Sequence, residues 1–301
     1  MQSKSVTVGI LSPGEMGSAI GRDMVRNGIR VISSLDDRSD RTKLLSKNVN
    51  IEDVGSYYEV VNQSDIILSI VVPSEAKNVG NIISETLRNS NHKIIYVDCN
   101  AISPDSVKSI SEMIVETGSI FVDAGIIGPP PNNNDIPRLY VSGPDLDLIM
   151  DLDGNGIKVV PIGEMIGSAS GMKMCYAGIT KGTSALYLAS LMVSNLFGIS
   201  DELITELEYS QKSVFSRIQN MNKIPTTAER FSGEMLEIAH TFSSIGMTSG
   251  FHFGAADVYR LIASTDLSSE TPENYPKDRS IKDLVNHLVN SIQKFNSEED
   301  R

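Results

Sequence analysis

The chain has 301 residues and a formal net charge of −12, and 40% of its residues are hydrophobic against 21% charged. This balance is typical of a soluble globular protein of about two domains. The acidic charge excludes nonspecific binding to nucleic acid or to an anionic membrane surface, because both require a basic surface, so we expect neither as a partner.

The first half of the chain alternates short β-branched runs with amphipathic stretches. Strands are predicted at 6–11, 30–35, 65–72, 93–98, 120–124, 138–143 and 157–162, and helices between them at 15–27, 40–48, 75–88, 104–117 and 145–152. Continuous valine and isoleucine runs favour strands that are covered on both faces, as in a parallel sheet. The alternation therefore predicts a doubly wound α/β domain. Proline and asparagine mark residues 128–135 as a loop.

The pattern changes after Ile162, where the strand-like runs stop. A single long helix is predicted from Glu164 to about Ile199, and further helices at 200–221, 226–245, 252–263 and 279–295. We therefore expect an α/β domain over residues 1–163, followed by an all-α domain over residues 164–301.

The first predicted strand runs into a glycine-containing loop of the type that binds a dinucleotide. A Rossmann loop uses a first glycine for the turn, a second for close approach to the pyrophosphate and a third for packing of helix on strand. Gly14 and Gly17 occupy the second and third positions, and Ser12 replaces the first. Serine can form this turn if its backbone angles stay in the ordinary region. We expect the cofactor to contact Ser12, Pro13, Gly14, Glu15 and Met16. An ordinary strand–helix turn is the alternative.

The residues after the second predicted strand bear on the choice of cofactor. An acidic side chain there binds the ribose hydroxyls of NAD, whereas an arginine accommodates the 2′-phosphate of NADP. The chain offers Asp36 and Asp37, and then Arg38 and Ser39. We favour NADP, held by Arg38 and Ser39, with NAD possible and solvated loop charges as the alternative.

Five segments in collinear order resemble motifs of the β-hydroxyacid dehydrogenase superfamily, which includes 6-phosphogluconate dehydrogenase. They are GEMG (14–17), SIVVPS (69–74), VDCNAISPDSV (97–107), FVDAGIIGPP (121–130) and GSASGMKMCYA (167–177). The resemblance implies a Rossmann domain, an NAD(P)-dependent oxidoreductase, and a catalytic lysine at Lys173. It also implies that Val72 and Pro73 flank the nicotinamide and that Asn100 contributes to the cofactor site.

The chain departs from the superfamily pattern where substrate is bound. Asn100 and Ala101 replace a serine–threonine pair, Gly125 a proline, Ile127 the substrate-binding serine, and Tyr176 and Ala177 two asparagines. Most groups that would bind a hydroxyacid carboxylate are therefore missing. The rebuilt substrate site is expected to include Ile127, Gly128, Tyr176, Lys181 and His252. Residues 230–260 resemble a separate branch of the superfamily, described only as 6-phosphogluconate-dehydrogenase-like.

Hydride transfer at a carbon–oxygen centre requires one group that moves a proton. A lysine does this when burial or a neighbouring cation lowers its pKa, and Lys173 is our candidate general acid/base, against a solvated helical lysine. Lys181 falls on the same helical face, as a second cation or as the partner of a carboxylate. His252 is a proton carrier or a structural histidine. Gly178 and Gly182 are expected to serve close helix packing.

Three functions fit these residues. The first is an NADP-dependent oxidoreductase of a small carbonyl or hydroxy compound, with Lys173 as general acid/base. The second is reduction of a carbon–nitrogen double bond, as in imine reductases on the same scaffold, and the third is dinucleotide binding without catalysis. We expect no metal, because no cluster has the spacing of metal ligands.

The cellular context and assembly also have sequence indications. Cys99 and Cys175 form no pair motif, which is consistent with a reducing compartment, and the start of the chain has no secretion-signal pattern. We therefore expect a cytoplasmic protein. In this superfamily the long helix often spans the subunit, and the helical domains of two chains pack together. Because the run ALYLASLMVSNLF (185–197) is also apolar nearly all round, we expect a homodimer.

Overall fold

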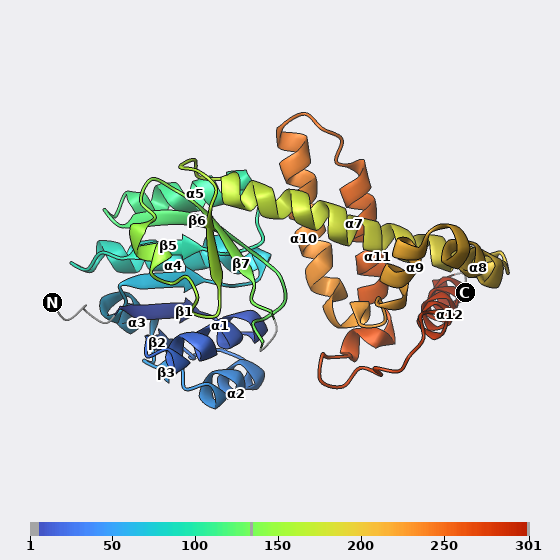
Figure 1. The fold of residues 1–301 in the computed structure, drawn as a ribbon, viewed down its shortest axis with the longest axis horizontal. Helices are drawn as coiled ribbons and strands as arrows, with labels where there is room; N and C mark the ends of the chain where they lie inside the picture. The colour runs from blue at the N-terminus through green and yellow to red at the C-terminus, as the bar shows by residue number, and fades with distance from the viewer. Residues whose placement is uncertain (1–5, 133–134, 300–301) are drawn as a thin grey trace. The chain divides into compact units, whose positions relative to one another are not determined.

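The computed structural model describes residues 6–132 and 135–299 and divides into two compact units, Met1–Cys175 and Tyr176–Arg301. The first unit contains an eight-stranded sheet with helices on both faces, and the described part of the second is helical (Figure 1). The predicted fold class, a Rossmann-type α/β domain followed by an all-α domain, is confirmed.

The sheet has the strand order β3-β2-β1-β4-β5-β6-β7-β8, with β6 and β7 antiparallel and the other pairs parallel. Its strands are β1 (Thr7–Leu11), β2 (Arg30–Ser33), β3 (Glu52–Asp53), β4 (Ile66–Ser69), β5 (Ile95–Asp98), β6 (Ile120–Ile127), β7 (Arg138–Ser142) and β8 (Lys158–Pro161). From β1 to β3 each new strand is added on one side of β1, whereas β4 and the strands after it are added on the other side. In doubly wound sheets, ligands bind outside the carboxyl ends of the strands at such a switch point.

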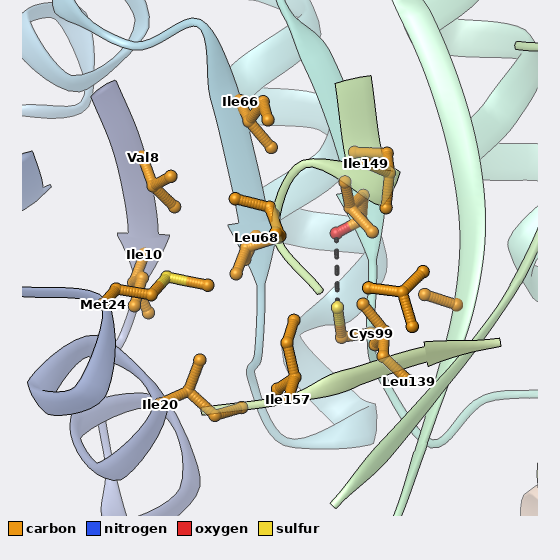
Figure 2. Close-up of a cluster of buried hydrophobic side chains, with 14 of the residues drawn as sticks. Val8, Ile10, Ile20, Met24, Ile66, Leu68, Cys99, Leu139, Ile149 and Ile157 are labelled. Carbon is orange, nitrogen blue, oxygen red and sulfur yellow. Dashed lines mark hydrogen bonds between the residues drawn. The ribbon is translucent and has the colours of Figure 1, made fainter. Parts of the chain in front are cut away.

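Helices cover the two faces of the sheet and bury two separate apolar clusters. They are α1 (Glu15–Arg26), α2 (Asp40–Asn48), α3 (Tyr57–Gln63), the short η1 (Pro73–Glu75), α4 (Ala76–Arg88), α5 (Pro104–Val115) and α6 (Asp147–Met150). One cluster joins α1 and α6 to the sheet through Ile20, Met24 and Ile149 (Figure 2). The other joins α3, α4 and α5 to the opposite face. Because both faces are covered, the central strands β1, β4 and β5 are buried along their whole length.

The longest helix, α7 (Ser168–Leu196), begins in the first unit and ends in the second. It is followed by α8 (Ser200–Ser210), α9 (Lys212–Gln219), η2 (Ile224–Thr227), α10 (Ala228–Ser244), α11 (Gly250–Ala263), η3 (Asp266–Ser269) and α12 (Ile281–Glu299). α10 and α11 pack against each other and against α7 at Gly178 and Gly182, where a Cβ would meet Ile238, Met235 or His252. The expected packing role is confirmed for Gly178, where a Cβ would lie 3.2 Å from His252 Cε1, but not for Gly182, where the nearest atom would be at an ordinary 3.8 Å. No helix of the described residues is long and apolar enough to span a bilayer.

The structure differs from the sequence expectations at several element boundaries. The strand expected to reach residue 72 ends at Ser69, because the amide of Val71 donates to the side chain of Asn100 instead of to a neighbouring strand. The helix expected over 200–221 is two helices with a break at Gln211, and that over 145–152 shortens to α6. Two elements, β3 and α3, were not expected. Within the loop expected at 128–135, residues 133 and 134 lie outside the described residues.

The division between the units falls inside α7, later than residue 163, where the strand pattern ends. The start of α7 groups with the sheet because the amides of Gly167, Ala169 and Ser170 donate hydrogen bonds to Asp123 on β6.

Candidate active site

The glycine loop connects β1 to α1 and contains an unusual backbone angle. Ser12 has φ +56°, in the left-handed region, and its carbonyl accepts a hydrogen bond from the Gly14 amide at 2.7 Å. The expectation that Ser12 keeps ordinary angles is therefore wrong: the serine makes the tight turn in the conformation that a glycine would adopt more easily. Gly17 is buried against β1, where a Cβ would lie 3.1 Å from Ile10 Cγ2. Gly17 thus has the packing role of the third glycine.

The amino end of α1 has the features of an anion site. The N-cap is Gly14, and no side chain caps the helix, whereas Ser39, Ser56 and Ser103 cap α2, α3 and α5. A Cβ built on Gly14 would approach no atom closer than the Ser12 carbonyl oxygen at 4.0 Å. The first-turn amides and the positive end of the helix dipole suit a pyrophosphate. The residues present therefore fit a dinucleotide, with Glu15 and Met16 in the first turn.

The loop after β2 carries the residues expected to select the cofactor. Asp36 and Asp37 are exposed, and Asp37 has φ +57°. Arg38 is half-buried, and its Nε donates to the Asp36 carbonyl at 3.3 Å. Ser39 caps α2 by accepting from the Thr42 amide, which gives this serine a structural role. Arg38 is therefore a candidate cation for the cofactor in the loop after β2.

The loop after β4 is held by Asn100, which sequence reasoning assigned to direct cofactor contact. The Asn100 Oδ1 accepts from the Val71 amide at 2.7 Å, and its Nδ2 donates to Ser69 Oγ at 3.0 Å. Its side chain is buried and bridges the ends of β4 and β5. Asn100 thus fixes the backbone that leads into Val72, which is exposed, and Pro73, the first residue of η1.

The start of α7 is anchored by a buried carboxylate that sequence reasoning missed. Asp123 on β6 is fully buried and accepts hydrogen bonds from the amides of Gly167, Ala169 and Ser170 and from the hydroxyls of Ser142 and Ser170. A carboxylate at the amino end of a helix is favoured by the helix dipole as well as by these hydrogen bonds. Sequence reasoning treated this position only as part of a substrate motif. Its partners come from residues that tertiary packing brings together.

This anchor places Lys173 against the sheet. A Cβ on Gly125, two residues after Asp123, would lie 2.9 Å from the Ala169 carbonyl oxygen and 3.1 Å from Lys173 Cβ. Gly125 therefore lets α7 approach β6 closely. Lys173 is half-buried on α7, and its charge acts on buried Asp98 and Cys99.

Asp98 is the second buried carboxylate at the carboxyl edge of the sheet, and it too was missed as a site residue. It lies beside Asp123 in the parallel register of β5 and β6. The pKa of Asp98 is raised from 3.8 to about 7, mainly by burial and also by the charge of Asp123, while hydrogen bonds from Asn100 and the charge of Lys173 oppose the rise. Burial also raises the pKa of the Cys99 thiol.

The residues expected to bind substrate are found in different settings. The side chain of Ile127 is buried at the end of β6. Gly128 has φ +130°, and a Cβ there would meet Pro137 Cα at 3.0 Å, so the fold itself requires this glycine. Tyr176 is exposed on α7, in the second unit.

Lys181 and His252 both lie in the second unit, in different surroundings. Lys181 forms an ion pair with Glu234, which is also bound by Arg230 at 2.5 Å, and lies 4.5 Å from the Phe231 ring centroid. The carboxylate-partner alternative for Lys181 is therefore confirmed. His252 is 7% exposed, its Nδ1 has no hydrogen-bond partner among the described residues, and burial lowers its pKa. Across residues 6–132 and 135–299, no group of side chains has the arrangement of a metal site.

Comparison with known proteins relates both parts of the chain to described families. Residues 7–146 match the family model for the NAD binding domain of 6-phosphogluconate dehydrogenase, and residues 195–262 match a domain of unknown function, DUF1932. An uncharacterized 28.5 kDa protein of Methanothermus fervidus is 29% identical over 69% of this chain and 78% of its own length.

Two solved structures share the fold over most of their length. The 3-hydroxyisobutyrate dehydrogenase of Mycobacterium tuberculosis has a TM-score of 0.68 at 14% identity and covers 95% of this chain and 99% of its own. An imine reductase of Myxococcus stipitatus, solved with NAD⁺, has a TM-score of 0.55 at 16% identity over 86% of this chain and 92% of its own.

Proposed function

We propose that the chain is an NADP-dependent oxidoreductase of a small carbonyl or hydroxy compound, because residues 7–146 match the NAD binding domain of 6-phosphogluconate dehydrogenase and the fold is shared with a 3-hydroxyisobutyrate dehydrogenase. The observation that carries the proposal is the placement of Lys173 by the Asp123 anchor and by Gly125, at the carboxyl edge of the sheet. The uncapped amino end of α1 supports the dinucleotide.

The roles of the residues follow from their positions. A bound nicotinamide would supply or accept the hydride. The ammonium of Lys173 donates its proton to the substrate oxygen during reduction, and the neutral amine accepts it during oxidation. Gly14, Glu15 and Met16 receive the pyrophosphate, and Arg38 pairs with the 2′-phosphate. Asn100 keeps the loop of Val72 in place beside them.

Cofactor titration is the first test. We expect purified protein to bind NADPH more tightly than NADH, and Arg38→Ala to weaken NADPH binding by about tenfold while NADH binding stays unchanged. Arg26→Ala, a surface arginine at the end of α1, is the matched control. If the protein prefers NADH, Asp36 or Asp37 rather than Arg38 selects the cofactor. If it binds neither dinucleotide, the proposal of an NAD(P)-dependent enzyme is wrong.

The catalytic role of Lys173 is tested with a substrate screen that includes keto acids, hydroxy acids and cyclic imines. Lys173→Ala should abolish turnover on the substrate found while cofactor affinity stays largely intact. Full activity in this variant would remove Lys173 from the mechanism.

Reduction of a carbon–nitrogen double bond is the second candidate, and the charge of the site favours it. The charges that act on buried Cys99 include those of Lys173 and Asp123, so the positive charge of Lys173 already has a carboxylate in its neighbourhood. This arrangement leaves no surplus positive charge for a carboxylate substrate. Ile127, buried in place of the substrate-binding serine, points the same way. Turnover of cyclic imines but not of keto acids would establish this alternative.

The proposal extends to assembly as a homodimer in the cytoplasm. Ile179, Leu186, Val193 and Phe197 are exposed on α7. The first three are spaced by seven residues, which places them on one face of the helix. A groove beside them is lined by Val193, Phe197 and Leu203. Exposed apolar surface of this extent is typical of an interface, and the partner that we propose is a second copy of the chain.

A further inference from the structure

Asp98 is a buried titratable group for which the proposed mechanism has no use. Its side chain is fully buried. Its Oδ1 accepts a hydrogen bond from the Asn100 amide at 2.9 Å, while its Oδ2 has no hydrogen-bond partner among the described residues. An ionised carboxylate in such a place leaves part of its charge unsolvated, which is costly. A neutral carboxylic acid avoids most of this cost.

The neighbouring carboxylate is in the opposite situation. Asp123 lies beside Asp98 in the register of the parallel strands, about 5 Å away at the backbone. It accepts hydrogen bonds from three amides and two hydroxyls and stands at the amino end of α7. The environment thus distinguishes two adjacent carboxyl groups: Asp123 has hydrogen bonds on both oxygens, whereas one oxygen of Asp98 has none among the described residues.

The surroundings of Asp98 supply one cation. On its own strand are Tyr96, whose hydroxyl has no partner among the described residues, and the buried Cys99. β4 contributes the uncharged Ser69, in register with Asp98. α4 and α5 cover this face with apolar side chains such as Ile83 and Ile110. Besides Asp123, the charge that acts on Asp98 is that of Lys173 on α7.

We infer that Asp98 is a positioning residue that changes between a neutral and an ionised form, and that its charge state sets how firmly Lys173 holds its proton. This inference rests on the proposed function of Lys173. When Asp98 is neutral, Lys173 releases its proton more readily. When Asp98 ionises, its negative charge stabilises the ammonium. Because the Asn100 amide donates to Asp98 and the Asn100 side chain holds the Val71 amide, Asp98 also connects Lys173 with the loop after β4.

Two measurements test the charge of Asp98 directly, and neither requires substrate or cofactor. In infrared spectra of the wild type, the carbonyl stretch of a buried protonated carboxylic acid should be present at pH 5 and disappear as the pH rises through about 7. The band should be missing at every pH in Asp98→Asn. Its absence from the wild type would overturn the inference even if the variant failed to fold.

The second measurement is the pH dependence of acetylation of Lys173, followed by mass spectrometry of the peptide that carries it. Above pH 7 we expect Lys173 to react severalfold faster in Asp98→Asn than in the wild type, because the amide cannot stabilise the ammonium. Asp105→Asn, an exposed carboxylate on α5, is the matched control and should leave the profile unchanged. Identical profiles in the wild type and Asp98→Asn would refute the coupling.

The two proposals can fail separately. If Lys173→Ala abolishes turnover but acetylation of Lys173 is insensitive to Asp98, the function stands and the inference falls. If the acetylation profile shifts but Lys173→Ala remains fully active, the coupling stands and the catalytic role of Lys173 is lost.

Discussion

The left-handed backbone of Ser12 costs about 1–2 kcal/mol in a residue with a side chain, because Cβ crowds the following carbonyl oxygen. The turn into α1 nevertheless needs this conformation, since the next residues must bring the Gly14 amide onto the Ser12 carbonyl. A serine there keeps a hydroxyl at the amino end of α1, where an anion is expected, at the expense of backbone strain.

Ser12→Gly should therefore raise the free energy of unfolding by about 0.5–1 kcal/mol, because relief of the strain exceeds the added entropy of glycine in the unfolded chain. Urea denaturation measures the change. Asn50→Gly is the control: Asn50 has φ +59°, but asparagine tolerates this region, so its gain should be smaller. A destabilised Ser12→Gly protein would show that the serine hydroxyl has contacts that outweigh the strain.

How far the sequence predicts individual residues depends on where their partners come from. Gly17 and Gly178 were assigned correctly, Gly17 from its place in the glycine loop and Gly178 from its place on the long helix. Asp98 and Asp123 read as ordinary residues at strand ends. Their properties arise from burial and, for Asp123, from amides of residues 167–170, which lie far away in the sequence. The sequence could not decide between the two roles of Lys181, because its partner Glu234 lies on another helix.

Among the secondary-structure elements, those with a long run of apolar residues or a clear apolar period were predicted from the sequence. β3 was missed because Glu52 and Asp53 have no strand propensity and are extended only through their pairing with β2. α3 has only seven residues, too few for a clear period. The start of α7 depends on contacts that no pattern shows, namely the Asp123 anchor and the bare backbone of Gly125.

Gly125→Ala tests this contact between two elements. The new Cβ would lie 2.9 Å from the Ala169 carbonyl oxygen, which is backbone and cannot rotate away, so α7 must shift. We expect a loss of about 1–3 kcal/mol in the free energy of unfolding and a displaced Lys173, seen as a changed acetylation rate at residue 173.

Gly14→Ala is the matched comparison, since the space around Gly14 is open apart from the Ser12 carbonyl oxygen at 4.0 Å. The free energy of unfolding of this variant should lie within about 0.5 kcal/mol of the wild-type value. Its affinity for NADPH should nevertheless be much lower, because the methyl group occupies the expected position of the pyrophosphate. Unchanged NADPH affinity in Gly14→Ala would place the cofactor elsewhere.

For the whole molecule, the sequence predicted the apolar character of the second half of α7 but not which of its faces the chain covers itself. Leu188 and Leu191 are buried within the chain, whereas Leu186 and Val193 are exposed. The covered face packs within the second unit, and the uncovered face remains for another molecule. A two-fold axis would bring the same stripe of each copy together, which is how most homodimers form.

Light scattering should accordingly give twice the chain mass of 32.7 kDa for the wild type and a single chain mass for Leu186→Glu, because a carboxylate buried at the centre of an apolar interface is not solvated. Leu44→Glu on α2 is the control, since Leu44 is 58% exposed and Leu186 62%. Both substitutions therefore replace a leucine that is exposed to solvent in the single chain. A wild type that is monomeric, or a Leu186→Glu protein that stays dimeric, would exclude this face of α7 as the interface. Retained NADPH binding in monomeric Leu186→Glu would further show that the dinucleotide site is complete within one chain.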